Sequence, residues 1–260
     1  MVHKARVAFA TPRQRLQDWL SYPPGSMLLE AEITLLGDSL TSLFGYHLLQ
    51  VGQLGNADLL TRSRISHRVV VDVDKGRNVS DYPCLWAEPD TLPIASDSID
   101  AIIFPHVLEF FPRVQETIKE AKRVLVAEGH LVVLAFNPWS LTGIWHLLFG
   151  GERKETWIPC QGGRFLGFGQ VRDWITGQGF EVISSKRYFF RPPASIGGMN
   201  RGGASDPLRF LDTIGPRFWP FLSGAYLLVA KKRVLTLTSR KPSWRQPRRL
   251  IAVGLGEPSS

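Results

Sequence analysis

The sequence predicts an α/β protein with a mostly parallel sheet. Two short apolar runs, residues 99–104 and 131–136, are rich in branched side chains and too short for helices, so each is predicted to be a strand buried on both faces. Between them, residues 113–125 carry apolar side chains at helical spacing, with Gln, Glu and Lys on the other side. Two strands joined by a helical crossover pair in parallel.

Residues 1–45 are predicted to form an N-terminal extension that contains two helices. Residues 11–20 favour a helix with Thr11 as its N-cap and Pro12 at its first position. Residues 27–44 place leucines and an isoleucine at a rough helical period. We expect this second helix to lie on the sheet or over a site at its edge.

A glycine turn follows the first predicted strand. Residues 47–51 form a short apolar run, and Gly52 and Gly55 come directly after it. A glycine turn after a strand lets the backbone approach a ligand closely, and a following helix N-terminus favours negative charge. We therefore expect this turn to line a ligand site.

The second predicted strand, residues 68–74, has an acidic end. Asp72 and Asp74 come about 20 residues after the glycine turn, the distance at which a carboxylate accepts hydrogen bonds from ribose hydroxyls in nucleotide-binding βαβ units. The spacing does not choose between the two aspartates.

Polar side chains also follow the next strands. Glu88 and Asp90 come after a short third strand, residues 82–87; His106 follows the fourth strand, and Asn137 follows the fifth. Ligands of open α/β sheets bind outside the carboxyl ends of the strands. These residues therefore predict half of a ligand site, whereas Glu109 is assigned to the start of the helix that follows.

The chain resembles the class I S-adenosylmethionine-dependent methyltransferases, particularly the type 11 group. The matching motifs are Glu88, Leu92-Pro93-Ile94, Ser98-Ile99-Asp100, His106-Val107-Leu108-Glu109 and the turn at residues 125–129. The resemblance implies a Rossmann-like, seven-stranded, mostly parallel sheet with helices on both faces. It also implies that the sixth strand, from Phe180, and the last strand, residues 225–230, form a hairpin that makes the last strand antiparallel.

The resemblance implies S-adenosyl-L-methionine as the cofactor. It places Gln50, Gly52 and Gly55 in the cofactor loop, Asp72 or Asp74 at the ribose, and Glu88 at the adenine amino group. His106 is expected to line the site on both the cofactor and the acceptor side. Gln50 occupies the usual acidic position, and Leu54 and Asn56 replace two glycines, so a Cβ at position 54 is expected to crowd the backbone beside the methionine portion.

On the acceptor side, the candidates are His106, Asn137 and Trp139, with burial in the core as the alternative for Trp139. No residue is assigned a catalytic role, because methyl transfer from a sulfonium depends on an aligned nucleophile more than on acid/base help. The methyl acceptor is not identified by the sequence. The two cysteines lack metal-ligand spacing, and no metal is expected.

We expect one methyltransferase-like domain, residues 46–233, with acceptor-side insertions or loops at 141–170 and 191–215. No apolar stretch reaches the roughly 18 residues of a membrane span, and a cytoplasmic location is expected. From Lys231 onward the chain has eight Lys or Arg and one Glu, which accounts for +7 of the net charge of +8. Residues 234–260 are expected to be a flexible basic tail that makes weak nucleic-acid contacts.

The sequence leaves open a second function from a different class. In that alternative, the chain is a catalytically inactive methyltransferase-fold protein that serves as an interaction or RNA-binding module through its basic tail. The two functions differ in whether the chain binds the cofactor at all.

Overall fold

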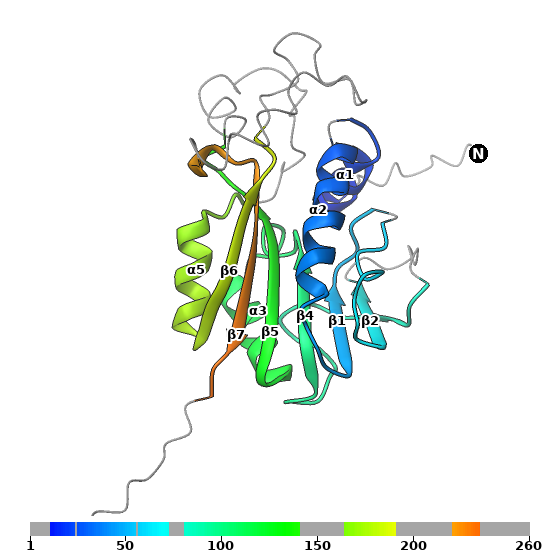
Figure 1. Cartoon of the computed structure of the whole chain (residues 1–260), viewed down its shortest axis with the longest axis vertical. Helices are drawn as coiled ribbons and strands as arrows, with labels where there is room; N and C mark the ends of the chain where they lie inside the picture. Colours follow the sequence, from blue (N-terminus) through cyan, green and yellow to red (C-terminus); the bar gives the residue numbers. More distant parts are fainter. Residues whose placement is uncertain are drawn as a thin grey trace, which may run out of the picture.

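The computed structural model describes residues 11–23, 25–55, 57–72, 81–140, 164–190 and 220–234 (Figure 1). Several sequence-based expectations fall outside these residues. They are the roles of Asn56 and Asp74, most of the predicted insertion at 141–170, the loop at 191–215, and the tail from residue 235.

Within the described residues, the strands form one seven-stranded sheet in the order β3-β2-β1-β4-β5-β7-β6. The strands are β1 His47–Val51, β2 His67–Asp72, β3 Cys84–Trp86, β4 Ile99–Pro105, β5 Leu125–Phe136, β6 Phe180–Tyr188 and β7 Ala225–Lys232. β1 to β5 pair in parallel, and β7 lies antiparallel between β5 and β6. The predicted fold class is confirmed.

The described helices are α1 Pro12–Leu20, α2 Gly25–Leu40, α3 Val114–Val124 and α5 Phe168–Gly177, with a 3-10 turn at Pro220–Leu222. The N-cap prediction at Thr11 is confirmed, because its side chain accepts a hydrogen bond from the Gln14 backbone while Gln14 Oε1 accepts one from Thr11 N. α2 begins two residues before the predicted start and ends at Leu40, earlier than the predicted residue 44.

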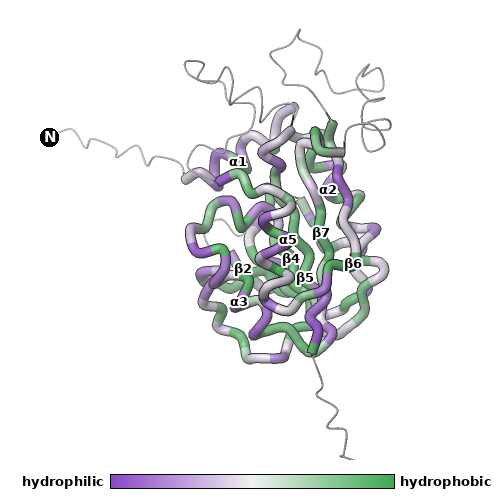
Figure 2. Tube along the Cα trace, turned by 90° about the vertical axis from the view of Figure 1, so that its left-hand side faces the viewer, coloured by the Kyte–Doolittle hydropathy of each residue, from purple (hydrophilic) through white to green (hydrophobic). Residues whose placement is uncertain are grey.

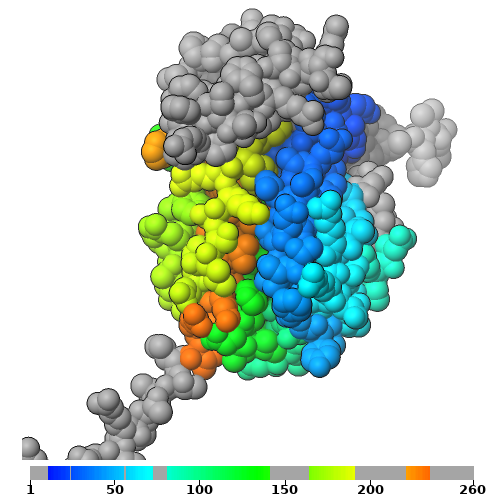
Figure 3. All heavy atoms as spheres, in the orientation of Figure 1, coloured from blue at the N-terminus to red at the C-terminus, as the bar shows by residue number. Residues whose placement is uncertain are grey.

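Helices cover both faces of the sheet. One apolar core cluster joins α1 and α2 to one face, through residues such as Leu16, Leu28 and Leu36. A second cluster joins α3 and α5 to the other face, through Ile118 and Ile175. In Figure 2 hydrophobic strands lie between the helices, and in Figure 3 the surface of α2 borders that of β6.

The fifth strand is longer than predicted because it contains an irregularity. Leu125 pairs with Ile99, and pairing resumes between His130 and Ala101, so the register shifts between the two contacts. Glu128 has a φ of +64° inside this interval. The turn at 125–129 therefore belongs to an interrupted β5 and does not precede it.

The carboxyl ends of β1, β2, β4 and β5 meet at one edge of the sheet, and α1 lies at this edge (Figure 1). The glycine turn, Asp72, His106 and Asn137 all follow or end these strands. The fold thus gathers the predicted site residues at a single edge.

Candidate active site

The glycine turn has the backbone conformation that its glycines allow. Gly52 has a φ of +85° and Gly55 a φ of +60°, both in the left-handed region. Gly52 N donates a 2.6 Å hydrogen bond to Val71 O, which ties the turn to β2. A Cβ added at Gly52 would overlap the guanidinium of Arg13, whereas one at Gly55 would meet only Leu29, at 4.0 Å.

Gln50 and Leu54, two of the residues that depart from the family pattern, leave the described part of this turn intact. Gln50 is buried, and its Nε2 donates a 2.9 Å hydrogen bond to Gly52 O, so it braces the turn from the end of β1. Leu54 is buried in the core cluster that contains Leu16 and Leu28. Its side chain points into that core.

Three polar side chains around the turn were missed by the sequence interpretation. Arg13 Nη2 donates to Gln53 O at 3.0 Å, and Gln17 Nε2 approaches the same oxygen at 3.4 Å. The side chains of Arg13, Gln17 and Gln53 are all buried. Arg13 and Gln17 are one helical turn apart, beside the buried Leu16 and Leu20. In the sequence, polar residues next to an apolar helical stripe were the signal that could have identified Arg13 and Gln17.

The acidic residues after β2 and β3 have different environments. Asp72 ends β2 and is buried. Glu88 is exposed, and its Oε2 lies 3.3 Å from Arg113 Nη2. The same nitrogen lies 2.8 Å from Asp90 Oδ2. Arg113 thus links the two acids that follow β3. Its pair with Glu88 is exposed on both sides and contributes little to stability, whereas the Asp90 side chain is buried.

A buried polar cluster connects α2, β4, β5 and β6. His106 Nε2 lies 2.8 Å from Glu32 Oε1, and His106 Nδ1 lies 2.9 Å from Glu109 Oε1. Tyr188 Oη donates to Glu32 Oε1 at 2.9 Å, and Phe136 N donates to Glu109 Oε1 at 2.9 Å. The His106 ring stacks on Phe136 at 4.0 Å between centroids. These contacts join four elements above the sheet edge.

The expectation that Glu109 starts a helix is wrong. α3 begins at Val114, and Glu109 is buried against His106 and the backbone of β5. Glu32 was missed, although it stands in the buried stripe Leu28, Glu32, Leu36 and Leu40 of α2. A carboxylate in such a stripe needs a buried partner, and this requirement was the available signal.

The cluster holds His106 in its protonated form. Burial lowers the pKa of the ring, but the Glu32 and Glu109 carboxylates outweigh burial and raise the pKa to about 10. Burial and the neighbouring Glu32 raise the pKa of Tyr188 well above its usual value, so Tyr188 stays a neutral donor.

We expect the raised pKa of His106 to make stability fall as pH rises. The folded pKa of about 10 lies above the ordinary 6.5, so the stabilisation is complete below pH 6.5 and is lost as pH rises to 10. Between pH 7 and 9 this corresponds to about 2–3 kcal/mol. Urea unfolding of the wild type and His106→Gln at both pH values measures it, and parallel losses in the two proteins would contradict the assignment.

The structure separates the acceptor-side candidates. Asn137 is buried, and its Nδ2 donates to Phe221 O at 2.7 Å and to Ser223 O at 3.0 Å, while its Oδ1 accepts from Trp139 N. The amide therefore fastens the end of β5 to the segment before β7. Trp139 is 66% exposed, so the core alternative for it is wrong.

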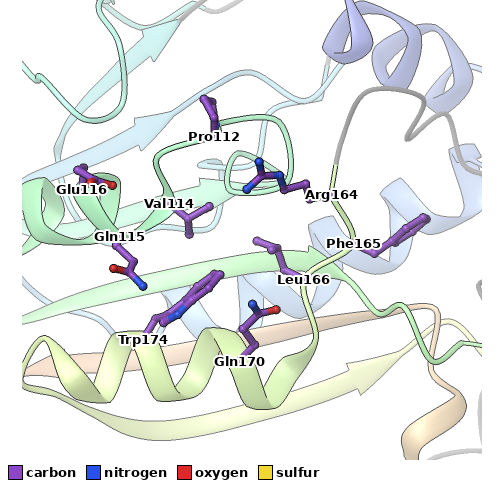
Figure 4. A pocket seen from close by; sticks show the side chains of 9 residues that line it. All are labelled: Pro112, Val114, Gln115, Glu116, Arg164, Phe165, Leu166, Gln170 and Trp174. Atoms are coloured by element: carbon purple, nitrogen blue, oxygen red, sulfur yellow. The ribbon is translucent and has the colours of Figure 1, made fainter.

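A cavity of about 490 Å³ lies between the first turns of α3 and α5 (Figure 4). Its lining includes Val114, Glu116, Arg164, Leu166 and Trp174, and none of the predicted site residues. Arg164 N donates to Glu109 O at 2.7 Å, so one wall of this cavity supports the loop that carries the buried cluster.

No group of three or more His, Cys, Asp or Glu in the described part of the chain is arranged to hold a metal ion. Among the described helices, none has the length and apolar character needed to cross a membrane.

Comparisons with known proteins identify the class. Residues 52–133 match the family model of the type 11 methyltransferase domain. A relative from Escherichia coli (strain K12), described as uncharacterized protein YafS, is 31% identical over 238 residues, which cover 91% of this chain and 90% of that protein.

Solved structures share the fold at low identity. An S-adenosylmethionine-dependent methyltransferase of Thermotoga maritima matches with a TM-score of 0.55 and 16% identity over 84% of this chain and 98% of that one. A chain from the complex of the Haloferax volcanii Trm112 methyltransferase activator with a methyltransferase matches with a TM-score of 0.57 and 13% identity. The match covers 87% of this chain and 100% of that one. Geranyl diphosphate C-methyltransferase from Streptomyces coelicolor, solved with S-adenosyl-L-homocysteine, matches with a TM-score of 0.53 and 14% identity. The match covers 80% of each chain.

The sheet order, the glycine turn after β1 and the acids after β2 and β3 define a class I methyltransferase fold. The chain belongs to the type 11 methyltransferase family. It is an S-adenosylmethionine-dependent methyltransferase whose acceptor is not identified.

Proposed function

We propose that the chain holds S-adenosylmethionine across the carboxyl ends of β1 to β4 and methylates an acceptor that donates hydrogen bonds. Gly52 and Gly55 approach the methionine portion, Asp72 or Asp74 accepts from the ribose, and Glu88 accepts from the adenine amino group. Bound S-adenosylmethionine supplies an electrophilic methyl group on a sulfonium centre. The protein residues bind it, orient the acceptor and exclude water.

The observation that carries this proposal is the conformation of the glycine turn. Both glycines keep left-handed backbone conformations, and a Cβ added at Gly52 would overlap the Arg13 guanidinium, which lies against the turn. Leu54 is turned into the core, and Gln50 braces the turn through Gly52 O. Within the described part of the turn, Gln50, Gly52, Leu54 and Gly55 are therefore compatible with the cofactor.

The buried cluster supports a hydrogen-bond donor as the acceptor. Glu32 Oε2 and Glu109 Oε2 are buried and have no hydrogen-bond partner among the described residues. Carboxylate oxygens only accept hydrogen bonds, and leaving them unpaired in the interior costs free energy. An N–H or O–H group on the acceptor would satisfy them. His106 already holds a proton between two carboxylates, so it does not serve as the base at neutral pH.

Isothermal titration tests cofactor binding directly. We expect saturable binding of S-adenosylmethionine and of S-adenosyl-L-homocysteine. Glu88→Ala should lower the affinity for both compounds by about tenfold or more, because it removes the hydrogen bond between the adenine amino group and the charged carboxylate. Glu116→Ala, at an exposed position in the first turn of α3, is the matched control. The absence of heat with both compounds would eliminate the proposal.

Three further expectations remain part of this proposal. The division into an extension at 1–45, a domain at 46–233 and a tail at 234–260 is supported by the sequence and by the sheet, which runs from His47 to Lys232. A cytoplasmic location is supported by the low cysteine count. Nucleic-acid contact is supported by the charge that is concentrated after Lys231.

A further inference from the structure

Two histidines lie side by side where β1 and β2 begin. His47 and His67 are partners in the register of the two parallel strands, and both are exposed. Alternate residues of a strand share a face, and Leu49 and Val69, two positions after each histidine, belong to the same core region. His47 Nδ1 lies 2.9 Å from His67 Nδ1, with 4.9 Å between the ring centroids. The pair lies at the opposite edge of the sheet from the proposed cofactor site, where the strands end (Figure 1).

Backbone hydrogen bonds fix the positions of both histidines. Tyr46 N and His47 N donate to Asp100 Oδ2 at 2.8 Å and 2.9 Å, which holds the start of β1 against β4. His67 N donates to Tyr46 O at 3.2 Å, which holds the start of β2 against β1. The two imidazoles therefore leave the same face of the sheet from adjacent, anchored strand ends.

The separation of the two Nδ1 atoms suits a shared metal ion. Imidazole nitrogens bind divalent first-row metals at about 2.0–2.1 Å, so two ligands at a right angle lie about 2.9 Å apart. A hydrogen bond between two neutral imidazoles uses the lone pair of one Nδ1 and the proton of the other. When that proton moves to Nε2 of the same ring, both Nδ1 atoms carry a lone pair, with no net change in protonation.

Stability alone gives a weak reason for this arrangement. Water competes for the hydrogen bonds of exposed side chains, so the contact between His47 and His67 contributes little to the free energy of unfolding. The backbone pairing of β1 with β2 holds the strand ends without it and continues to Val51. The convergence of two imidazole nitrogens on one point is better explained by a ligand that both bind.

The geometry points to a two-histidine chelate at His47 and His67 for a divalent first-row transition metal, with Cu²⁺ bound most tightly. Imidazole is a good ligand for these metals, and their order of affinity peaks at Cu²⁺. Ligands at a right angle also match the tetragonal geometry of Cu²⁺ or Ni²⁺ better than the tetrahedral geometry of Zn²⁺. Among the described residues, no third His, Cys, Asp or Glu completes the set, so water or an external ligand fills the other positions.

The sequence does not reveal this pair. The two histidines are 20 positions apart, whereas sequence motifs for metal sites rely on ligands a few residues apart. They meet only because β1 and β2 pair in parallel with these two residues opposite each other.

Copper titration tests the site. Full-length protein without an affinity tag would be titrated with CuCl₂ by calorimetry in a glycine buffer. All proteins would carry His3→Gln, because a histidine at the third position chelates Cu²⁺ together with the amino terminus of an expressed chain. We expect one tightly bound Cu²⁺ per chain, with an electron paramagnetic resonance spectrum that shows two imidazole nitrogens. His47→Gln and His67→Gln should each weaken binding by at least about tenfold and leave no more than one imidazole nitrogen in the spectrum.

His130→Gln is the matched control, because His130 is a half-buried histidine in β5 that has no histidine partner among the described residues; it should keep the full affinity. MgCl₂ should not compete for the site, since Mg²⁺ prefers oxygen ligands. Equal affinity of the parent protein, His47→Gln and His67→Gln would overturn the chelate, and so would a parent spectrum with a single imidazole nitrogen. Circular dichroism of each variant in EDTA confirms that folded proteins are compared.

Discussion

Replacing His106 with leucine is expected to lower the free energy of unfolding by about 3–5 kcal/mol. The substitution removes the cation that lies 2.8 Å from Glu32 and 2.9 Å from Glu109. Both carboxylates are fully buried, so they would remain in the interior without their charged partner. The loss should appear as a lower urea midpoint, followed by fluorescence at pH 7.

His67→Leu provides the matched control for this experiment. His67 is exposed at the start of β2 and contacts His47 through their Nδ1 atoms at 2.9 Å. Its replacement should change stability by no more than about 0.5 kcal/mol. If His106→Leu cost no more than His67→Leu, the buried cluster would not hold the charges assigned to it.

Replacing Gly52 with valine is expected to remove measurable binding of S-adenosyl-L-homocysteine. The φ of +85° is unfavourable for a β-branched residue, and the added side chain would overlap the Arg13 guanidinium. The turn and α1 would have to separate, which would displace the backbone that approaches the cofactor. Calorimetric titration of the purified variant measures the result.

Gly169→Ala is the control, because a Cβ there meets nothing within 4 Å and the residue lies in α5, on the opposite face of the sheet from α1. It should bind as the wild type does. Retention of wild-type affinity by Gly52→Val would show that the cofactor does not approach this turn, and the proposed site would then be wrong.

The strands and crossover helices were predictable because their signals are local. Short apolar runs mark β1, β4 and much of β5, and helical spacing marks α3. The true start of β5 was not predictable in the same way. Leu125 belongs to the strand only because it pairs with Ile99, which lies 26 positions earlier, and no local pattern records that pairing.

The site was predictable where it depends on strand ends and not where it depends on distant partners. The positions of Gly52, Asp72 and His106 at one edge follow from the parallel sheet. The pairing of His106 with Glu32 joins residues 74 positions apart and depends on how α2 lies on the sheet. The direction of the Leu54 side chain was not predictable for the same reason, since it is set by the core and not by its neighbours in sequence.

The place of β7 has a consequence for synthesis of the chain. Among the described strands, β7 is the last along the chain, yet it pairs along its length with both β5 and β6. Until Ala225–Lys232 has left the ribosome, β5 and β6 each present an unpaired edge. A polypeptide that ends before this strand would therefore carry two open edges in the middle of its sheet. The sheet therefore stays incomplete until β7 has been synthesised.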